Sequence, residues 1–216
     1  MPNLDLHKIE NQLSKPICEA AIPKQYKDPI DVLNRWRYLS EQFPRFLGAI
    51  LARSPLPAAQ CLVAKNITGE CGGGDAAAMH SKLLGELVGP VITRSRETFS
   101  ESHLSRVIEQ NLATIATMGE GQSIGFLIGL EAPAYEILAL LRRCLLEAGA
   151  TAEAIDGSVY MATHQEVEAE HQKDSLLMAQ IVAELGCDEA AILEGGHRAV
   201  EFWQAWWGAE IHAKAS

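Results

Sequence analysis

Residues 158–185 contain neither glycine nor proline, so this stretch can form one long helix around which a small fold must be built. Good helix formers dominate it, and we expect a helix over about 157–186. His164, Glu168 and His171 lie within it at positions i, i+4 and i+7, which places their side chains on one helix face. Two imidazoles and a carboxylate on one stripe are ligands suited to iron or manganese.

This triplet has a second interpretation as part of a solvated helix face, because Glu166 and Glu170 add charge to the same segment. Flanking apolar residues, among them Tyr160 and Met161, instead indicate that the helix also faces a core. Polar groups near a core are costly to bury without partners. The stripe therefore predicts a metal site only if acids and histidines elsewhere in the chain complete it.

The rest of the chain is also predicted to be helical, because Ala, Leu, Glu, Gln and Arg dominate and alternating β-branched runs are missing. At 216 residues we expect a single all-α domain over 1–216, with residues 1–27 as an N-terminal extension that can itself be helical. A bundle of about seven to eight helices is expected. The predicted helices cover residues 5–13, 29–53, 57–71, 75–89, 101–118, 122–149, 157–186 and 188–213.

Helix ends and breaks follow from a few residues. Asp28 and Asp75 are predicted to cap the helices that follow them. Pro44 is expected to kink or split the second helix, and Pro133 to kink or loosen the 122–149 helix. The pair Gly195–Gly196 is expected to interrupt the last helix.

Charge and cysteine usage limit the class of protein. A formal net charge of −10 argues against binding nucleic acid or anionic membranes. No basic apolar leader is seen, and no apolar run reaches the ~18–20 residues that cross a bilayer. The cysteines are widely spaced and form no C-x-x-C, which favours a cytoplasmic protein over a disulfide framework. They are Cys18, Cys61, Cys71, Cys144 and Cys187.

Glu70 and His80 are the first candidate partners for the stripe. They flank a glycine-rich break at residues 72–74, which lets both side chains aim at one point. A phosphate cradle is an alternative, but no G-x-x-x-x-G-K-[ST] motif follows the glycines. An ordinary loop between helices with a surface histidine is the other alternative.

Glu131 is the third candidate. It follows the apolar run 123–130, so its carboxylate is expected to be buried and to need a cation or a hydrogen-bond donor. A salt bridge to Arg142 or Arg143 is the competing interpretation.

The ordered set of these residues resembles the haem-oxygenase-like diiron oxidases and oxygenases, which are related in fold to the TenA and PqqC proteins. Their pattern is an N-x3-E segment and a His, then an isolated Glu, then H-x3-D/E-x2-H. Residues 38–47 are similar to the first core helix of that family, and the resemblance covers about residues 30–205. The matching residues are Glu70, His80, Glu131, His164, Glu168 and His171.

Ferritin-like diiron proteins are the rival architecture, and they need two E-x-x-H motifs on regular helices. The Glu168–His171 segment fits, whereas Glu194–His197 runs through two glycines. Two departures from the haem-oxygenase-like pattern stand out: Glu168 replaces the commoner Asp, and the glycines lengthen the interval between the first Glu and His. One branch of the family makes aminobenzoate by consuming its own tyrosine, and Tyr26 would be the corresponding candidate here.

The resemblance implies two irons held by the six residues, with Glu131 as a bridging carboxylate. It also implies O2 as co-substrate and an external electron donor. The expected function is oxidation of a small metabolite, such as an amino acid, amine or fatty acid, in specialised metabolism. N-oxygenation, desaturation and C–C cleavage are the expected reaction types.

Substrate-binding residues are harder to assign. Tyr38, Tyr135 and Tyr160 are candidates for lining the pocket. The arginines that could bind a substrate carboxylate are Arg45, Arg53, Arg142 and Arg143. The aromatic stripe at 202–207 is typical of core packing, with a homodimer contact or a pocket roof as alternatives. The histidines without ligand spacing, which we expect not to bind metal, are His103, His197 and His212.

Two other function classes remain. A metal-free relative of the TenA type would hydrolyse or rearrange a heterocycle with a cysteine nucleophile and a carboxylate. A non-catalytic helical interaction protein would bind no metal. Iron binding separates both from the oxidase or oxygenase.

Overall fold

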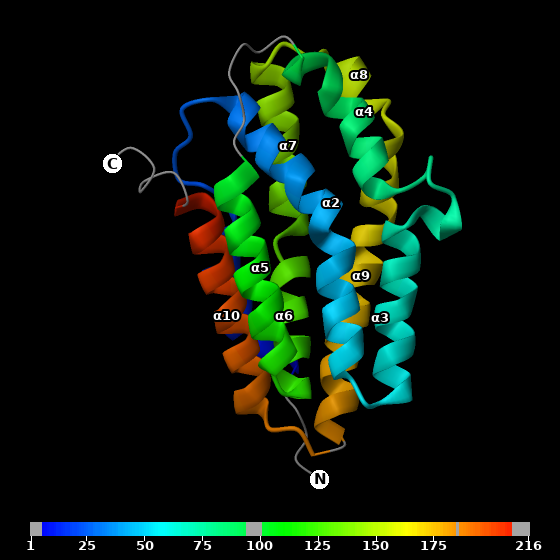
Figure 1. The fold of residues 1–216 in the computed structure, drawn as a ribbon, viewed down its shortest axis with the longest axis vertical. Coiled ribbons are helices and arrows are strands. Elements are labelled where there is room, and N and C mark those ends of the chain that lie inside the picture. The colour runs from blue at the N-terminus through cyan, green and yellow to red at the C-terminus, as the bar shows by residue number, and fades with distance from the viewer. Residues whose placement is uncertain (1–5, 94–100, 185, 209–216) are drawn as a thin grey trace.

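The computed structural model describes residues 6–93, 101–184 and 186–208, and within these ranges the expected all-α fold is confirmed (Figure 1). The described residues contain no strand. The elements are α1 (Leu6–Ala21), α2 (Pro29–Arg53), α3 (Pro57–Glu70), η1 (Gly72–Gly74), α4 (His80–Ile92), α5 (Glu101–Thr117), α6 (Glu120–Glu131), α7 (Ala134–Glu147), α8 (Ala152–Asp156), α9 (Val159–Glu184) and α10 (Glu189–Gly208).

The helices form an elongated bundle. Helices α2, α3, α5, α6, α9 and α10 follow its long axis, and α4, α7 and α8 gather toward one end (Figure 1). Helix α1 packs against α10 and contributes Ile9, Leu13 and Ile17 to the core. The described residues form more helices than we expected, because the predicted 122–149 helix divides at residues 132–133 and the short helix α8 forms where none was predicted.

Several predicted helix boundaries are confirmed and others are wrong. The Asp28 side chain accepts a hydrogen bond from the Ile30 N–H, as an N-cap should. Helix α2 continues through Pro44 and is not split there. Helix α4 begins at His80 rather than near residue 75, because Asp75 instead caps a turn by accepting from the Ala77 N–H at 2.9 Å.

The glycine pair in α10 does not interrupt the helix, contrary to expectation. The two glycines instead let α10 approach α6 closely. A Cβ atom at Gly195 would lie 1.9 Å from the Gln122 carbonyl oxygen, and one at Gly125 would lie 1.9 Å from the Ile192 carbonyl oxygen. Packing between helices has therefore outweighed the low helix propensity of glycine.

The break after α6 places Glu131 at the end of that helix. Helix α6 ends at Glu131 and α7 begins beyond Pro133, as the proline predicts. The span Glu120–Glu147 is long and apolar enough to cross a membrane by length and composition. Because 72% of its apolar window is buried inside the bundle, this apolarity is explained by the core.

Two apolar clusters fill the bundle and meet at the candidate site. The larger cluster contains Phe46, Phe126 and Phe202, whose rings pack edge to face or tilted at 5.5–6.2 Å between centroids. The smaller cluster lies among α2, α4, α7 and α9. Trp36 packs against both clusters, and the C-terminal aromatic stripe lies mostly in the larger one.

Candidate metal centre

Four of the six predicted ligands come together in the interior of the bundle. Glu70 ends α3, His80 begins α4, Glu131 ends α6, and His164 lies near the start of α9. Their exposed fractions are 8%, 5%, 5% and 8%. Ionisable side chains this deeply buried need partners, because an isolated buried charge is costly. Residues from four helices thus form one buried polar cluster.

The glycine-rich turn brings Glu70 and His80 into contact. His80 Nδ1 lies 3.1 Å from Glu70 Oε1. Gly72 has a φ of +64°, and a Cβ there would lie 2.5 Å from the Ala78 carbonyl carbon, so only glycine fits this turn. Burial lowers the pKa of His80, but the hydrogen bond and charge of Glu70, with the charge of Glu131, leave that pKa above its usual value.

Glu131 is held by Asn66, the Asn of the N-x3-E segment, which was not among the predicted ligands. The Asn66 side-chain amide donates a hydrogen bond to Glu131 Oε1 at 2.8 Å. Burial raises the pKa of Glu131 to about 7, although this hydrogen bond favours the charged form. A metal ion that binds this carboxyl would displace its proton. Asn66 precedes Glu70 by one helical turn, and this i, i+4 spacing was the available signal.

The Asn66 carbonyl oxygen, Oδ1, is buried and has no hydrogen-bond partner. Buried polar atoms in proteins are nearly always paired, so an unpaired acceptor at a polar cluster indicates that a further group binds there. A donor on a bound molecule, such as a metal-bound water, would satisfy it.

The tautomer of His164 is fixed by the backbone. Its Nδ1 lies 2.9 Å from the Tyr160 carbonyl oxygen, which can only accept, so Nδ1 carries the proton. In the neutral ring Nε2 then keeps its lone pair, which is the form in which imidazole binds metals. The His164 ring lies 4.6 Å from the His80 ring and 4.0 Å from the Tyr160 ring, measured between centroids.

The remaining two predicted ligands, Glu168 and His171, have side chains that lie outside the described residues. The backbone of α9 is helical from Val159 to Glu184, so it includes both positions. Among the side chains that the structure describes, no three His, Cys, Asp or Glu are arranged to hold a metal ion by themselves. The described part of the cluster supplies carboxylate and imidazole donors, which are the ligand types that non-haem iron takes.

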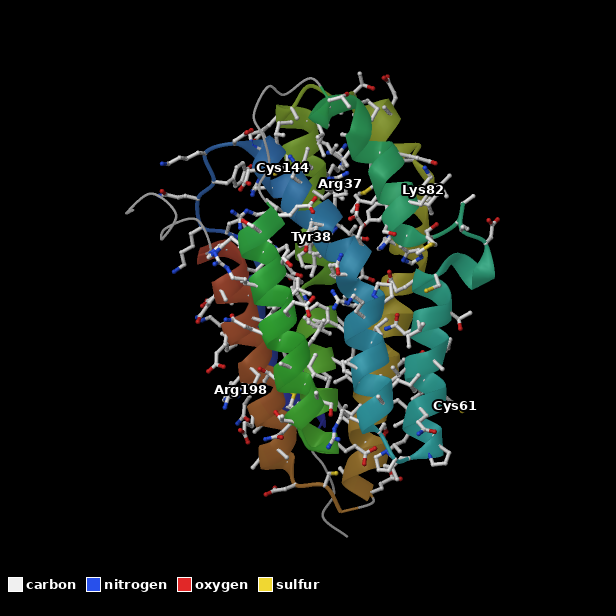
Figure 2. All side chains as sticks on the ribbon, viewed as in Figure 1. Arg37, Tyr38, Cys61, Lys82, Cys144 and Arg198 are labelled. Atoms are coloured by element: carbon white, nitrogen blue, oxygen red, sulfur yellow. The ribbon has the colours of Figure 1, made fainter. Side chains whose placement is uncertain are left out.

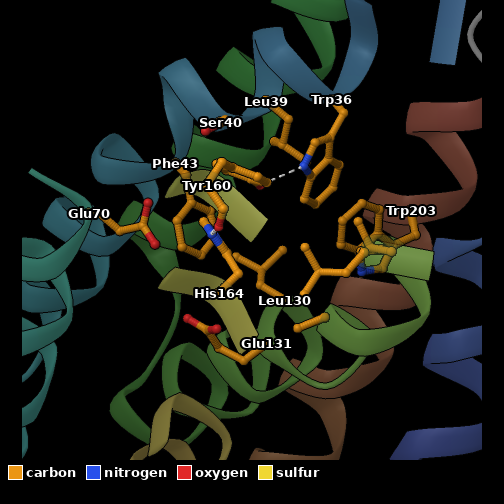
Figure 3. A pocket seen from close by; sticks show the side chains of 13 residues that line it. Trp36, Leu39, Ser40, Phe43, Glu70, Leu130, Glu131, Tyr160, His164 and Trp203 are labelled. Carbon is orange, nitrogen blue, oxygen red and sulfur yellow. Dashed lines mark hydrogen bonds between the residues drawn. The ribbon is translucent and has the colours of Figure 1, made fainter. Parts of the chain in front are cut away.

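A small pocket of about 60 Å³ adjoins the cluster (Figure 3). Glu70, Glu131 and His164 line one side of it, and most of the other walls are apolar, including Leu130 and Trp203. Figure 3 shows these three polar side chains turned toward the same space, with Trp36 and Trp203 across from them. The pocket can thus exclude water from whatever binds at the cluster.

Of the three tyrosines predicted to bind substrate, only Tyr160 lines this pocket. Tyr38 lies in the core and stacks on Trp206 at 6.4 Å between centroids (Figure 2). Tyr135 is 45% exposed and is not part of the lining. The break between α6 and α7 explains this, because it removes the helical register that would align Tyr135 with Glu131.

The arginines expected to hold a substrate carboxylate bind elsewhere. Arg45 pairs with Glu109, Arg53 donates to the Met118 carbonyl, Arg142 pairs with Asp156, and Arg143 donates to the Tyr26 hydroxyl. No Lys or Arg is among the described residues that line the pocket.

The histidines expected not to bind metal lie away from the cluster where they are described. His103 is within 2.9 Å of Arg106 on an exposed surface, and His197 is exposed on α10. Glu194 also faces solvent and pairs with Arg198, which Figure 2 shows on the outer side of α10. The second ferritin-like motif is therefore on a continuous helix but faces outward. His212 lies outside the described residues.

Asn66→Ala is expected to weaken iron binding by about 10–100-fold, because loss of a group that orients a ligand typically has this effect. The change removes the 2.8 Å hydrogen bond to Glu131. Anaerobic Fe(II) titration would measure it. Thr68→Ala, an exposed change on the same helix, should leave affinity unaltered. Equal affinities for wild type and Asn66→Ala would show that Asn66 does not position Glu131 for a metal.

The chain is similar to solved structures of one fold and to the sequences of one protein family. A crystal structure of a CADD-like protein of unknown function from Nostoc punctiforme superposes with a TM-score of 0.72 at 13% identity, covering 96% of this chain and 98% of that one. A second crystal structure of that protein gives a TM-score of 0.67 at 13% identity, covering 98% of each chain. No curated protein matches the sequence. Residues 31–204 match the sequence model of the iron-containing redox enzymes, and the chain therefore belongs to this family.

Proposed function

We propose that this chain is a non-haem diiron oxidase or oxygenase that uses O2 to oxidise a small metabolite. The observation that supports it most is the convergence of four buried ionisable side chains, from four helices, beside a mostly apolar pocket. Membership of the iron-containing redox enzymes supports the choice of metal. The proposed ligands are Glu70, His80, Glu131 and His164, completed by Glu168 and His171.

When bound, the irons would supply the electrons that activate O2, and an external reductant would then reduce the irons again. The chain's own residues do the rest. His164 presents Nε2 because its Nδ1 proton is held by the Tyr160 carbonyl. Asn66 donates a hydrogen bond to one oxygen of the Glu131 carboxylate and so orients this proposed ligand. Glu70 orients the His80 ring, and the apolar walls keep water from the substrate.

The metal-free hydrolase is less well supported. Such an enzyme needs a reactive cysteine at the pocket, and no cysteine is among the described lining residues. Burial raises the pKa of Cys18 to about 11 and also raises the pKa of Cys144 and Cys187, which disfavours a thiolate.

The aminobenzoate-forming alternative also has little support at the pocket. Tyr26 lies against α7, where its hydroxyl donates to Glu147 and accepts from Arg143 Nε. Burial raises the pKa of Tyr26 to about 12. It is not among the described residues that line the pocket.

Anaerobic titration with Fe(II) should saturate at about two irons per chain, because six carboxylate and imidazole ligands suffice for two non-haem irons. The loaded protein should then consume O2 on exposure to air. His164→Ala should lower the stoichiometry and the O2 uptake, whereas His197→Ala on the outer face of α10 should change neither. Saturation at zero iron, or O2 uptake unaffected by His164→Ala, would reject the proposal.

A further inference from the structure

Tyr160 forms part of the wall of two separate hollows. It lines the 60 Å³ pocket beside the cluster and also a groove of about 490 Å³ on the other side. The groove lies between α4, α8 and the start of α9, and Tyr160 is the residue that the two described linings share. Tyr160 is only 2% exposed, so its side chain is packed in the interior where the two linings meet.

Contacts on both sides hold this ring in place. The Trp36 indole N–H donates a hydrogen bond to the Tyr160 hydroxyl at 3.2 Å, shown as a dashed line in Figure 3. The ring also packs on His164 at 4.0 Å between centroids. Trp36 is itself stacked on Trp203 at 6.3 Å. A ring fixed by a hydrogen bond and by stacking acts as a wall.

The chemistry of the two hollows differs. The ionisable groups of the pocket lie on one side only. The described lining contains no Lys or Arg, so it offers no cation that would bind an acidic group at the other end of a ligand. Its 60 Å³ is far below the roughly 300–1,000 Å³ of common ligand sites. The groove is lined mainly by apolar side chains, among them Leu87, Val91 and Val159, and Val159 is 62% exposed.

We infer that Tyr160 is a specificity-determining wall, which confines the pocket to small molecules with one polar end and shuts them off from the groove. The polar end would face the cluster and the apolar body would meet Trp36, Leu39 and Trp203. A molecule with a longer apolar tail fits once the ring is removed, because the tail then enters the groove. The chemical identity of the ligand's polar end depends on the proposed function, whereas the role of Tyr160 as a wall depends only on the two hollows that it lines.

The test uses unbranched 1-aminoalkanes of increasing length, bound to the metal-free protein and measured by calorimetry. In the wild type, the affinity for the aminoalkane should rise with alkyl-chain length only up to a short cut-off length. In Tyr160→Ala, affinity should continue to rise about fourfold per added methylene as the chain enters the groove. Tyr160→Phe keeps the ring and should keep the short cut-off.

A double variant tests whether the apolar tail enters the groove. Ala154 is exposed and lines the groove, so Ala154→Phe added to Tyr160→Ala should occupy part of the groove and shorten the longest chain that binds tightly. If Tyr160→Ala does not fold, Tyr160→Leu serves in its place with a smaller extension. The same cut-off in wild type and in the folded small-residue variant would overturn the inference, as would a wild type that binds long chains or none.

Failure of the wall and failure of the proposed function give different results. Repeating the series anaerobically with Fe(II)-loaded protein, using alkanoates beside the aminoalkanes, shows which polar end the metals prefer. Absence of iron binding with a Tyr160-dependent cut-off would reject the diiron proposal and leave the wall intact. Normal iron binding, with the same chain-length dependence of affinity in Tyr160→Ala as in the wild type, would reject the wall and leave the diiron proposal intact.

Discussion

Glu131→Ala is expected to abolish tight iron binding while the protein remains folded. Glu131 is 5% exposed and receives the Asn66 amide hydrogen bond at 2.8 Å. Its carboxylate is our candidate for the ligand shared by both irons, so its loss removes a bond to each. The fall in iron affinity should be larger than the loss of about 10–100-fold that typically follows removal of a residue that only orients a ligand. Fe(II) titration and O2 consumption measure the effect.

The fold should tolerate this change. Burial of the Glu131 carboxyl raises its pKa to about 7, so removing this penalised group offsets the loss of its hydrogen bond from Asn66. Helical circular dichroism and the thermal midpoint should therefore stay close to the wild type. Glu136→Ala, five residues away on an exposed face of α7, is the matched control and should bind iron normally. Full iron binding by Glu131→Ala would contradict its assignment as a ligand.

Gly125→Ala should destabilise the protein by about 3 kcal/mol, the upper end of what overpacking typically costs, because a tight interface forces backbone to move. The added methyl would lie 1.9 Å from the Ile192 carbonyl oxygen and 2.7 Å from its carbonyl carbon. Neither atom can be displaced by a side-chain rotation. Separation of α6 from α10 would also disturb the hydrogen bond from the Trp203 indole to the Gly129 carbonyl. Denaturant unfolding measures the loss.

The control for this variant is another helical glycine with free space around it. A Cβ at Gly85 in α4 would meet no atom within 4 Å. Gly85→Ala should therefore stabilise the protein by roughly 0.5–1 kcal/mol through helix propensity alone. Gly195→Ala, whose methyl would lie 1.9 Å from the Gln122 carbonyl oxygen, should behave like Gly125→Ala. Similar stability changes at Gly85 and Gly125 would contradict the close approach of α6 and α10.

Local patterns predicted much of the fold and part of the site. The long stretch around His164 is one helix, and the break beyond Glu131 follows from Pro133. The glycine-rich turn was expected to bring Glu70 and His80 together, and their side chains are 3.1 Å apart. Each of these features depends on residues close in sequence, where helix propensity and turn chemistry act directly.

Features that depend on packing between distant helices could not be predicted in the same way. Asn66 and Glu131 are 65 residues apart, so their contact is invisible to helical spacing. The pair Gly195–Gly196 was expected to interrupt the last helix, but the close packing of α10 on α6 makes glycine the residue that the helix requires there. The burial of Tyr38 against Trp206 likewise depends on how α10 lies across α2.

Anomalous diffraction at the iron absorption edge, from crystals of Fe(II)-loaded protein, tests the central claim most directly. We expect two iron peaks beside the pocket, with Glu131 between them and with His80 and His164 as imidazole ligands. It would also show whether Glu168 and His171 complete the ligand set. Absence of iron at this cluster, or iron bound only elsewhere on the protein, would contradict the account.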